Sequence, residues 1–271
     1  MLQVRLRLIT ASVALPILAI LVFWGGWLFS LGIAVVAAVA VIEICNMARS
    51  GGFYPLSIVS VFSVVLIVCI GYFLSQDPLY IFPVPVILAT ASLVYLTWVI
   101  ASNNPVSWIS NIGVTIACPC YVGCLMFYAP ILRGIDQGTL WVLVTLTVTF
   151  AVDTGALYAG KKFGKNLMVP SISPSKTWEG AVAGFILSIV LTPMLVIFLD
   201  LIDSLYLALG LGFLIGIVGQ LGDLAESKLK RVAGFKDSGV LMPGHGGVLD
   251  RLDSVVFNLA LVYYFVIWTI Q

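Results

Sequence analysis

The chain has 271 residues, of which 61% are hydrophobic and only 9% are charged. A soluble domain carries about 25% charged residues, so this composition excludes an ordinary water-soluble fold. The formal net charge of +1 lacks the basic excess that is typical of nucleic-acid-binding proteins, and we expect no nucleic-acid partner.

The apolar residues fall in runs of about 20 residues, the length at which an α-helix crosses a hydrocarbon core roughly 30 Å thick. Lipid offers the backbone no hydrogen-bonding partner, and runs this long and uniformly apolar do not suit the strands of a membrane β-barrel. We therefore predict an all-α, polytopic transmembrane helical bundle of about nine spans. The predicted spans lie near residues 8–24, 27–47, 53–75, 79–101, 106–129, 138–160, 180–202, 205–222 and 254–270.

The basic residues indicate the orientation of this bundle, because Lys and Arg concentrate in cytoplasmic connections. With nine spans and a cytoplasmic N-terminus, only Arg133 of the 13 basic residues lies outside, which leaves twelve inside. The sequence therefore predicts a multi-pass protein of the cell inner (cytoplasmic) membrane. Nine basic residues fall in two cytoplasmic loops, at about 161–179 and 223–253. We accordingly divide the chain into N-terminal transmembrane helices (1–137) and a region that carries the functional residues (138–271).

The first polar region follows a carboxylate inside a span. Asp153 lies in the predicted sixth span, where an ionisable side chain is costly and is a functional candidate by default; the alternative is a hydrogen bond between helices. Further on, Ser175 or Thr177 can cap a helix in whose first turn Glu179 is favourable. A helix start of this kind binds anions. Lys176 would add a mobile positive charge for a phosphate, or would contact anionic lipid head groups.

The second polar region begins with acids and a base at helical spacing. Asp223, Glu226, Ser227 and Lys230 share one face if the eighth helix continues past the membrane. Glycines then surround the only histidine, His245. Because glycines lack the Cβ atoms that keep a phosphate away from backbone amides, this segment predicts an anion-binding nest. A flexible turn into the last helix is the alternative.

Asp223 and Asp250 resemble a carboxylate pair for a hard cation, because Mg²⁺ is typically held by one or two carboxylates together with substrate phosphates. The alternative is a salt-bridge network in which Lys230, Arg231 and Arg251 neutralise these acids. Several cations beside several acids nonetheless suit a site whose ligand brings further negative charge.

Two other polar features carry less weight. Glu43, near the cytoplasmic end of the second span, is a weaker candidate because a carboxylate within one turn of the interface can reach water. Cys118, Cys120 and Cys124 lie in an apolar run, where they either form a soft-metal site or pack one helix against its neighbours; we expect packing. The odd total of five cysteines argues against a disulfide framework.

The second polar region resembles the signature of the phosphatidate cytidylyltransferases, also called CDP-diacylglycerol synthases. Its pattern is Ser227-x-x-Lys230-Arg231, then Lys236-Asp237, then Pro-Gly-His245-Gly246-Gly247-x-x-Asp250-Arg251-x-Asp253. More than ten identities within 27 residues make chance agreement remote. Asp153-Thr-Gly-Ala and Ser173-Pro-x-Lys176-Thr177-x-Glu179-Gly resemble earlier motifs of that family, in the same order. The resemblance covers residues 140–260 well and the first five helices only by hydropathy.

The resemblance implies an enzyme that joins CTP to phosphatidic acid in the membrane, giving CDP-diacylglycerol and pyrophosphate for phospholipid biosynthesis. It also implies dependence on Mg²⁺, with a second cation left open, a polar cavity that faces the cytoplasm, and a homodimer. A CTP-dependent lipid kinase would leave CDP instead. A secondary transporter would place its site near the membrane midplane on paired repeats, whereas here the charge lies at one face and no repeat is visible.

The resemblance also suggests roles for individual residues. Asp223 and Asp250 would bind the metal, and the catalytic set would be completed by Asp153, Lys230 and Arg231. The substrate-binding residues would be Ser173, Lys176, Thr177, Glu179, Glu226, Ser227, Lys236, Asp237, His245, Gly246, Gly247, Arg251 and Asp253.

Overall fold

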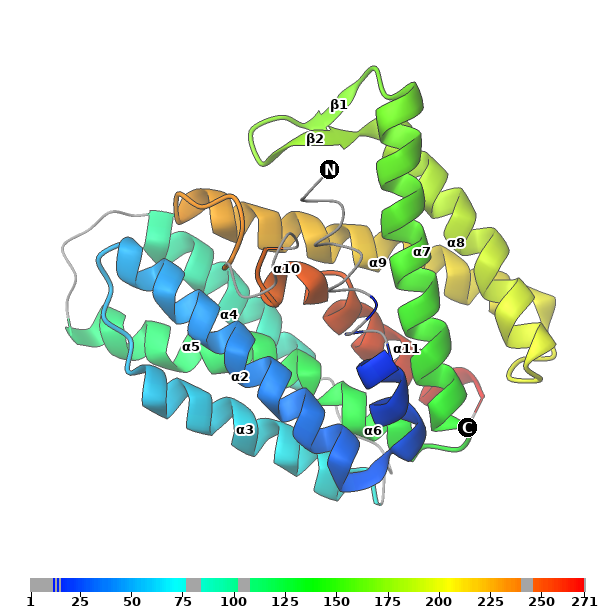
Figure 1. Cartoon of the computed structure of the whole chain (residues 1–271), viewed down its shortest axis with the longest axis horizontal. Coiled ribbons are helices and arrows are strands. Elements are labelled where there is room, and N and C mark those ends of the chain that lie inside the picture. Colours follow the sequence, from blue (N-terminus) through cyan, green and yellow to red (C-terminus); the bar gives the residue numbers. More distant parts are fainter. Residues whose placement is uncertain are drawn as a thin grey trace. The chain divides into compact units, whose positions relative to one another are not determined.

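A computed structural model describes residues 12, 14, 16–76, 84–101, 108–239 and 246–270. They form helices and one two-stranded sheet in two compact units, drawn in Figure 1. Unit 1 holds the described residues up to Ile135 and from Leu229 to Leu252, and unit 2 holds those of Asp136–Lys228 and from Asp253 onward. The elements of unit 1 are α2 (Gly26–Ser50), α3 (Ser57–Leu74), α4 (Val84–Ala101), α5 (Trp108–Met126), α6 (Tyr128–Gly134) and α10 (Leu249–Leu252).

The elements of unit 2 are α7 (Gly138–Phe163), β1 (Leu167–Val169), β2 (Ser173–Thr177), α8 (Trp178–Phe198) and α11 (Val255–Thr269). Helix α9 (Leu205–Val232) begins in unit 2, and its last residues belong to unit 1. Each unit thus combines segments that are distant from one another in the sequence. The functional division at residues 137 and 138 stays a prediction.

Seven helices in the described part of the chain are long and apolar enough to cross a membrane. They are Gly26–Ser50, Ser57–Leu74, Ile109–Gly134, Gly138–Phe163, Trp178–Phe198, Leu205–Val232 and Leu249–Thr269. Large apolar side chains also point away from the protein, among them Ile58 (87% exposed) and Phe198 (81% exposed). Apolar surface of this extent suits contact with lipid. The prediction of a polytopic helical membrane protein is confirmed.

These seven helices coincide with seven of the predicted spans. The predicted span 8–24 lies partly outside the described residues, and its described end, 16–24, is helical. The predicted span 79–101 is described from residue 84 onward as α4, which contains the shorter apolar helix Ile87–Ile100. The predicted break after residue 24 is confirmed by Gly25 and Gly26, whose φ angles of 68° and 54° lie in the left-handed region that glycine tolerates.

The largest difference from the predicted spans is the length of α9. The predicted span ended at residue 222, and the residues from 223 were assigned to a cytoplasmic loop into which the helix could continue. The helix does continue, to Val232. Residues 224–232 contain good helix formers and neither Gly nor Pro. Helix α9 ends where Gly234 adopts a φ of 80° and the amide of Phe235 donates to the carbonyl of Lys230 at 2.8 Å, as in a Schellman motif.

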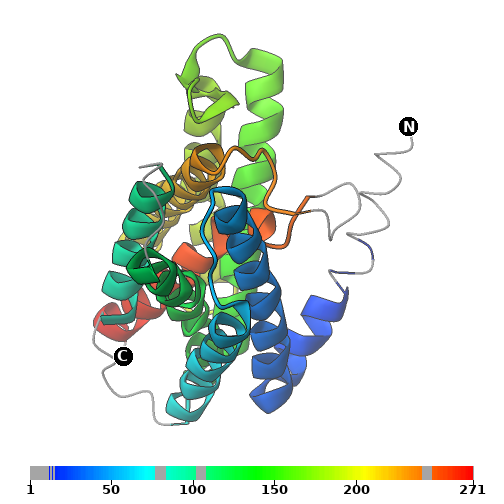
Figure 2. The same cartoon turned by 90° about the vertical axis from the view of Figure 1, so that its left-hand side faces the viewer.

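Unit 1 is a bundle in which α2, α3, α4 and α5 pack side by side, as Figure 2 shows. Small residues allow this close approach. Helix α2 buries Ala34, Ala37 and Ala40 along one face. A Cβ atom added at Gly71 of α3 would lie 2.7 Å from the carbonyl oxygen of Phe127. The helices are therefore held by backbone contact as much as by large side chains.

Arg133, the one basic residue predicted outside, has a structural role in unit 1. Its Nε donates a hydrogen bond to the carbonyl of Val22 at 2.8 Å, and its Nη2 donates to that of Phe23 at 3.4 Å. These carbonyls lie just before the break at Gly25, where the helical pattern leaves them without helical partners. Arg133, the one basic residue predicted outside, thus caps the end of the helical segment that precedes Gly25.

In unit 2, α7 packs along α8 through glycines, because a Cβ atom on Gly180 would lie 2.6 Å from the carbonyl oxygen of Ala156. An antiparallel hairpin, β1–β2, occupies much of the predicted loop 161–179 and lies at one end of these helices (Figure 1). Thr177 ends β2 and caps α8 by accepting from the amide of Gly180 at 3.2 Å. The predicted cap and the first-turn position of Glu179 are confirmed.

Candidate active site

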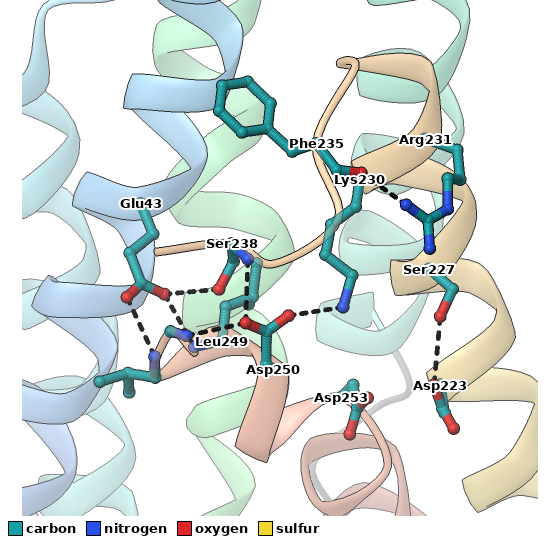
Figure 3. Close-up of polar contacts among 12 residues, drawn as sticks. Glu43, Asp223, Ser227, Lys230, Arg231, Phe235, Ser238, Leu249, Asp250 and Asp253 are labelled. Carbon is teal, nitrogen blue, oxygen red and sulfur yellow. Dashed lines mark hydrogen bonds and ion pairs between the residues drawn. The ribbon is translucent and has the colours of Figure 1, made fainter. Parts of the chain in front are cut away.

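In unit 1, Asp250 is surrounded by hydrogen-bond donors. Its Oδ1 accepts from Lys230 Nζ at 2.5 Å, and its Oδ2 accepts from the amides of Ser238 at 2.9 Å and Gly247 at 2.8 Å. Figure 3 shows these contacts. The side chains of Asp250 and Lys230 are only 6% and 10% exposed. Charge-assisted hydrogen bonds are stronger than neutral ones, so the Asp250 carboxylate has a fixed position.

The glycines of the second polar region make room for this carboxylate. Gly246 has a φ of 84°, and a Cβ atom on it would lie 2.7 Å from Asp250 Oδ2. Gly247 donates its amide to the same oxygen. The expected anion nest thus holds a carboxylate of the chain itself. His245, also predicted to bind substrate, lies outside the described residues.

Four further candidates in unit 1 are exposed: Arg231, Lys236, Asp237 and Arg251. Of these, Arg231 donates from Nη1 to the carbonyl of Phe235 at 3.1 Å, which fixes the end of α9. The three basic side chains among them are exposed, so they can contact an anionic ligand that arrives from water.

In unit 2, the two polar regions of the sequence meet. Lys176, on β2, forms an ion pair with Asp223, on α9, at 2.5 Å, and both side chains are about a quarter exposed, at 26% and 27%. Ser227, one turn further along α9, donates from Oγ to Asp223 Oδ1 at 3.2 Å. The hairpin therefore places Lys176, which is predicted to bind a phosphate, beside Asp223, which is predicted to bind the metal.

Asp253 lies within electrostatic range of three other carboxylates of unit 2. These are Asp223, Glu226 and Asp153, and Glu226 is fully buried. Asp153 also accepts a hydrogen bond from Ser254 Oγ at 3.5 Å. Like charges in close proximity disfavour one another unless a cation joins them. The group thus has the negative charge that attracts a cation.

Other predicted residues support the hairpin. Glu179 accepts hydrogen bonds from Asn166, at 3.2 Å from the amide and 2.9 Å from Nδ2. Ser173 is buried at the start of β2. With the cap at Thr177, these contacts shape the segment that presents Lys176. Their predicted contacts with substrate stay predictions.

Sequence reasoning underestimated Glu43. It was expected to reach water, but it is only 6% exposed and accepts hydrogen bonds from Ser238 Oγ at 2.9 Å, Val248 N at 3.0 Å and Leu249 N at 2.9 Å. One signal was present: Glu43 follows the buried Ala40 by three residues and precedes the buried Met47 by four, which places it on the packed face of α2. Ser238 carried no such signal.

The profile of the cytidylyltransferase family matches residues 5–269. The chain belongs to the cytidylyltransferase family. The phosphatidate cytidylyltransferase of Bacillus subtilis (strain 168) is 32% identical to it over 271 residues, which cover 97% of this chain and 98% of that protein. Those of Staphylococcus aureus (strain COL) and Staphylococcus haemolyticus (strain JCSC1435) are 32% and 33% identical, covering 95% of this chain and 97% of each relative.

The match extends through the first five helices of this cytidylyltransferase, which the motif resemblance reached only by hydropathy. The region matched by the family therefore includes the helix that carries Glu43 as well as the segments that carry Asp223 and Asp250. Among the residues that the structure describes, no three acidic, histidine or cysteine side chains are arranged to hold a metal by themselves. A cytidylyltransferase whose metal is shared with substrate phosphates does not need such a group.

Proposed function

We propose that this cytidylyltransferase transfers the cytidylyl group of CTP to phosphatidic acid, giving CDP-diacylglycerol and pyrophosphate for phospholipid biosynthesis. The observation that carries the proposal is similarity along nearly the whole chain to relatives that are named phosphatidate cytidylyltransferase. The residues from Ser227 to Asp253, which resemble the family signature, lie within the matched region. A membrane bundle suits a reaction in which one substrate is a lipid.

In this reaction a phosphate oxygen of phosphatidic acid forms a bond to the α-phosphorus of CTP, and the bond from that phosphorus to the pyrophosphate oxygen breaks. The nucleophile is already anionic near neutral pH, so no strong general base is required. The protein must position the two substrates and offset their charge. Lys176, Lys230, Arg231 and Arg251 supply the positive charge.

Mg²⁺ dependence is part of the proposal, with Asp223 and Asp250 as ligands and a second cation left open. Each carboxylate fits this role separately. Asp223 is partly exposed and interacts electrostatically with the carboxyl group of Asp253. Asp250 Oδ1 accepts one recorded hydrogen bond, from Lys230, and a carboxylate oxygen has two lone pairs. When bound, the ion would neutralise phosphate charge in the transition state.

Purified protein given CTP, phosphatidic acid and Mg²⁺ is expected to release pyrophosphate and to form a CDP-lipid, and EDTA is expected to stop both. Nucleotide and lipid products are measured together. CDP with a phosphorylated lipid would indicate the lipid kinase instead, and a chain that consumes no nucleotide would fit the transporter. Turnover that persists without divalent metal would remove the metal assignment and leave the transfer reaction standing.

We further propose that the protein resides in the inner membrane as a homodimer, with its N-terminus and its active site in the cytoplasm. Cysteine labelling tests the orientation in a variant without the five native cysteines. A cysteine introduced by Phe235→Cys is expected to react only from the cytoplasmic side. Asp203→Cys, in the exposed connection between α8 and α9, is the matched control and is expected to react only from outside. The reverse pattern would overturn the topology and the position of the site together.

A further inference from the structure

Glu43 joins two segments that are distant from it in the sequence. Its Oε2 accepts hydrogen bonds from Ser238 Oγ and from the amide of Leu249, both at 2.9 Å, and its Oε1 accepts from the amide of Val248 at 3.0 Å. All of these residues belong to unit 1, and Figure 3 shows the carboxylate of α2 directed at them. One side chain therefore fixes the backbone on both sides of the segment 239–247.

The same contacts lead to Asp250. Ser238 donates its hydroxyl to Glu43 and its amide to Asp250 Oδ2, and Leu249, held by Glu43, directly precedes Asp250. The position of the Asp250 carboxylate thus depends on two groups that Glu43 holds. Displacement of a reacting or metal-binding group by about 1 Å can lower a rate by about a hundredfold.

The carboxylate of Glu43 is closely surrounded by the backbone of two glycines. A Cβ atom on Gly239 would lie 2.5 Å from Glu43 Oε1, and one on Gly247 would lie 2.6 Å from Oε2. The recorded donors to Glu43 are neutral, one hydroxyl and two amides. Burying a carboxylate among neutral donors is costly compared with an apolar side chain of similar volume, so packing alone does not account for this residue.

We propose that Glu43 is a positioning residue for the transfer reaction, which holds the carboxylate of Asp250 in place through Ser238 and the start of α10. This inference rests on the proposed function. It gives α2 an indirect part, through Ser238 and the start of α10, in a site whose signature residues all lie near the other end of the chain.

The deciding variant is Glu43→Gln, which keeps the shape of the side chain. Because each carboxylate oxygen of Glu43 accepts from a backbone amide, the NH₂ group of glutamine opposes an N–H in either orientation. We expect kcat to fall about a hundredfold, with the KM for CTP changed less than about threefold because none of the three hydrogen-bond donors to Glu43 is a predicted substrate-binding residue. Amide hydrogen exchange is expected to rise in residues 236–239 and 246–252 and to stay unchanged in α7.

Cys45→Ala is the matched control, since Cys45 is fully buried on the same helix and no hydrogen bond joins it to those of residues 238–249 that the structure describes. It is expected to lower the melting temperature while kcat stays within about twofold. Glu43→Asp keeps the charge on a shorter side chain and is expected to retain more activity than Glu43→Gln.

The outcomes separate this inference from the proposed function. A wild-type protein that forms no CDP-lipid would refute the proposed function, and hydrogen exchange would still test the link from Glu43 to residues 236–239 and 246–252. Wild-type kcat in Glu43→Gln, or a loss no greater than the loss of folded protein, would overturn the positioning role. If Glu43→Gln does not fold, Ser238→Ala decides: we expect a kcat about fivefold lower, and an unchanged kcat would refute the link.

Discussion

Replacing Asp250 by asparagine is expected to lower CDP-lipid formation by at least about a hundredfold, because a carboxylate that binds a shared metal stabilises the transition state by several kcal/mol. The structure adds a second expected effect. Asp250 and Lys230 are both buried, and removing one partner of a buried ion pair costs about 3–5 kcal/mol. Asp250→Asn is therefore also expected to lower the melting temperature. Both quantities are measured on the detergent-solubilised protein.

The double variant Asp250→Asn with Lys230→Met separates the two effects. Removing the stranded ammonium is expected to restore much of the melting temperature, since an uncharged pair avoids the cost of a lone buried charge. Activity is expected to stay low because the carboxylate is still missing and the ammonium of Lys230, which offsets phosphate charge, has been removed as well. If the double variant instead recovers turnover, Asp250 serves only the ion pair and its role as a ligand is refuted.

Replacing Asp223 by asparagine is also expected to lower turnover by about a hundredfold or more. Here the melting temperature is expected to stay close to that of the wild type. The pair with Lys176 is about a quarter exposed, and exposed ion pairs contribute only about 0–1 kcal/mol to stability. The measurement is kcat with Mg²⁺ titrated to excess, beside a melting curve.

Lys176→Gln is the control for the Asp223 variant, because it breaks the same ion pair from the other side. A lysine that offsets phosphate charge is expected to act mainly on the KM for CTP or phosphatidic acid, whereas the Asp223 variant loses kcat. Equal losses in the two variants, with no further loss in the double variant, would assign Asp223 to the pair alone. Near-normal turnover of Asp223→Asn would have the same meaning.

The membrane fold could be predicted from the sequence because its cause is local. An apolar run of sufficient length forms a span whatever surrounds it. The two adjacent glycines at 25 and 26 likewise indicate a break between helices from the sequence alone. The helical spacing from Asp223 to Lys230 left open that the helix continues past the predicted span, which ended at 222, and it does so for ten residues, to Val232. Polarity marks where the helix leaves the membrane, whereas Gly234 marks where it ends.

The site was only partly predictable, because its contacts are between distant segments. Helical spacing placed Ser227 beside Asp223, and the hydrogen bond between them confirms that proximity. Nothing in the spacing indicated that Lys176 would reach Asp223, since that depends on a hairpin of short strands with weak sequence signals. Glu43 was underestimated for the same reason: its depth in the membrane could be estimated, but its partners lie about 200 residues further along the chain.

The distance along the chain between Glu43 and its partners has a consequence for biosynthesis. Ser238 follows Glu43 by 195 residues, which ribosomes translate in roughly 10–40 s. Through that interval α2 can enter the bilayer while the donors that satisfy its carboxylate have not yet been made. The contacts of Glu43 in unit 1 are therefore completed only after Ser238, Val248 and Leu249 have been translated.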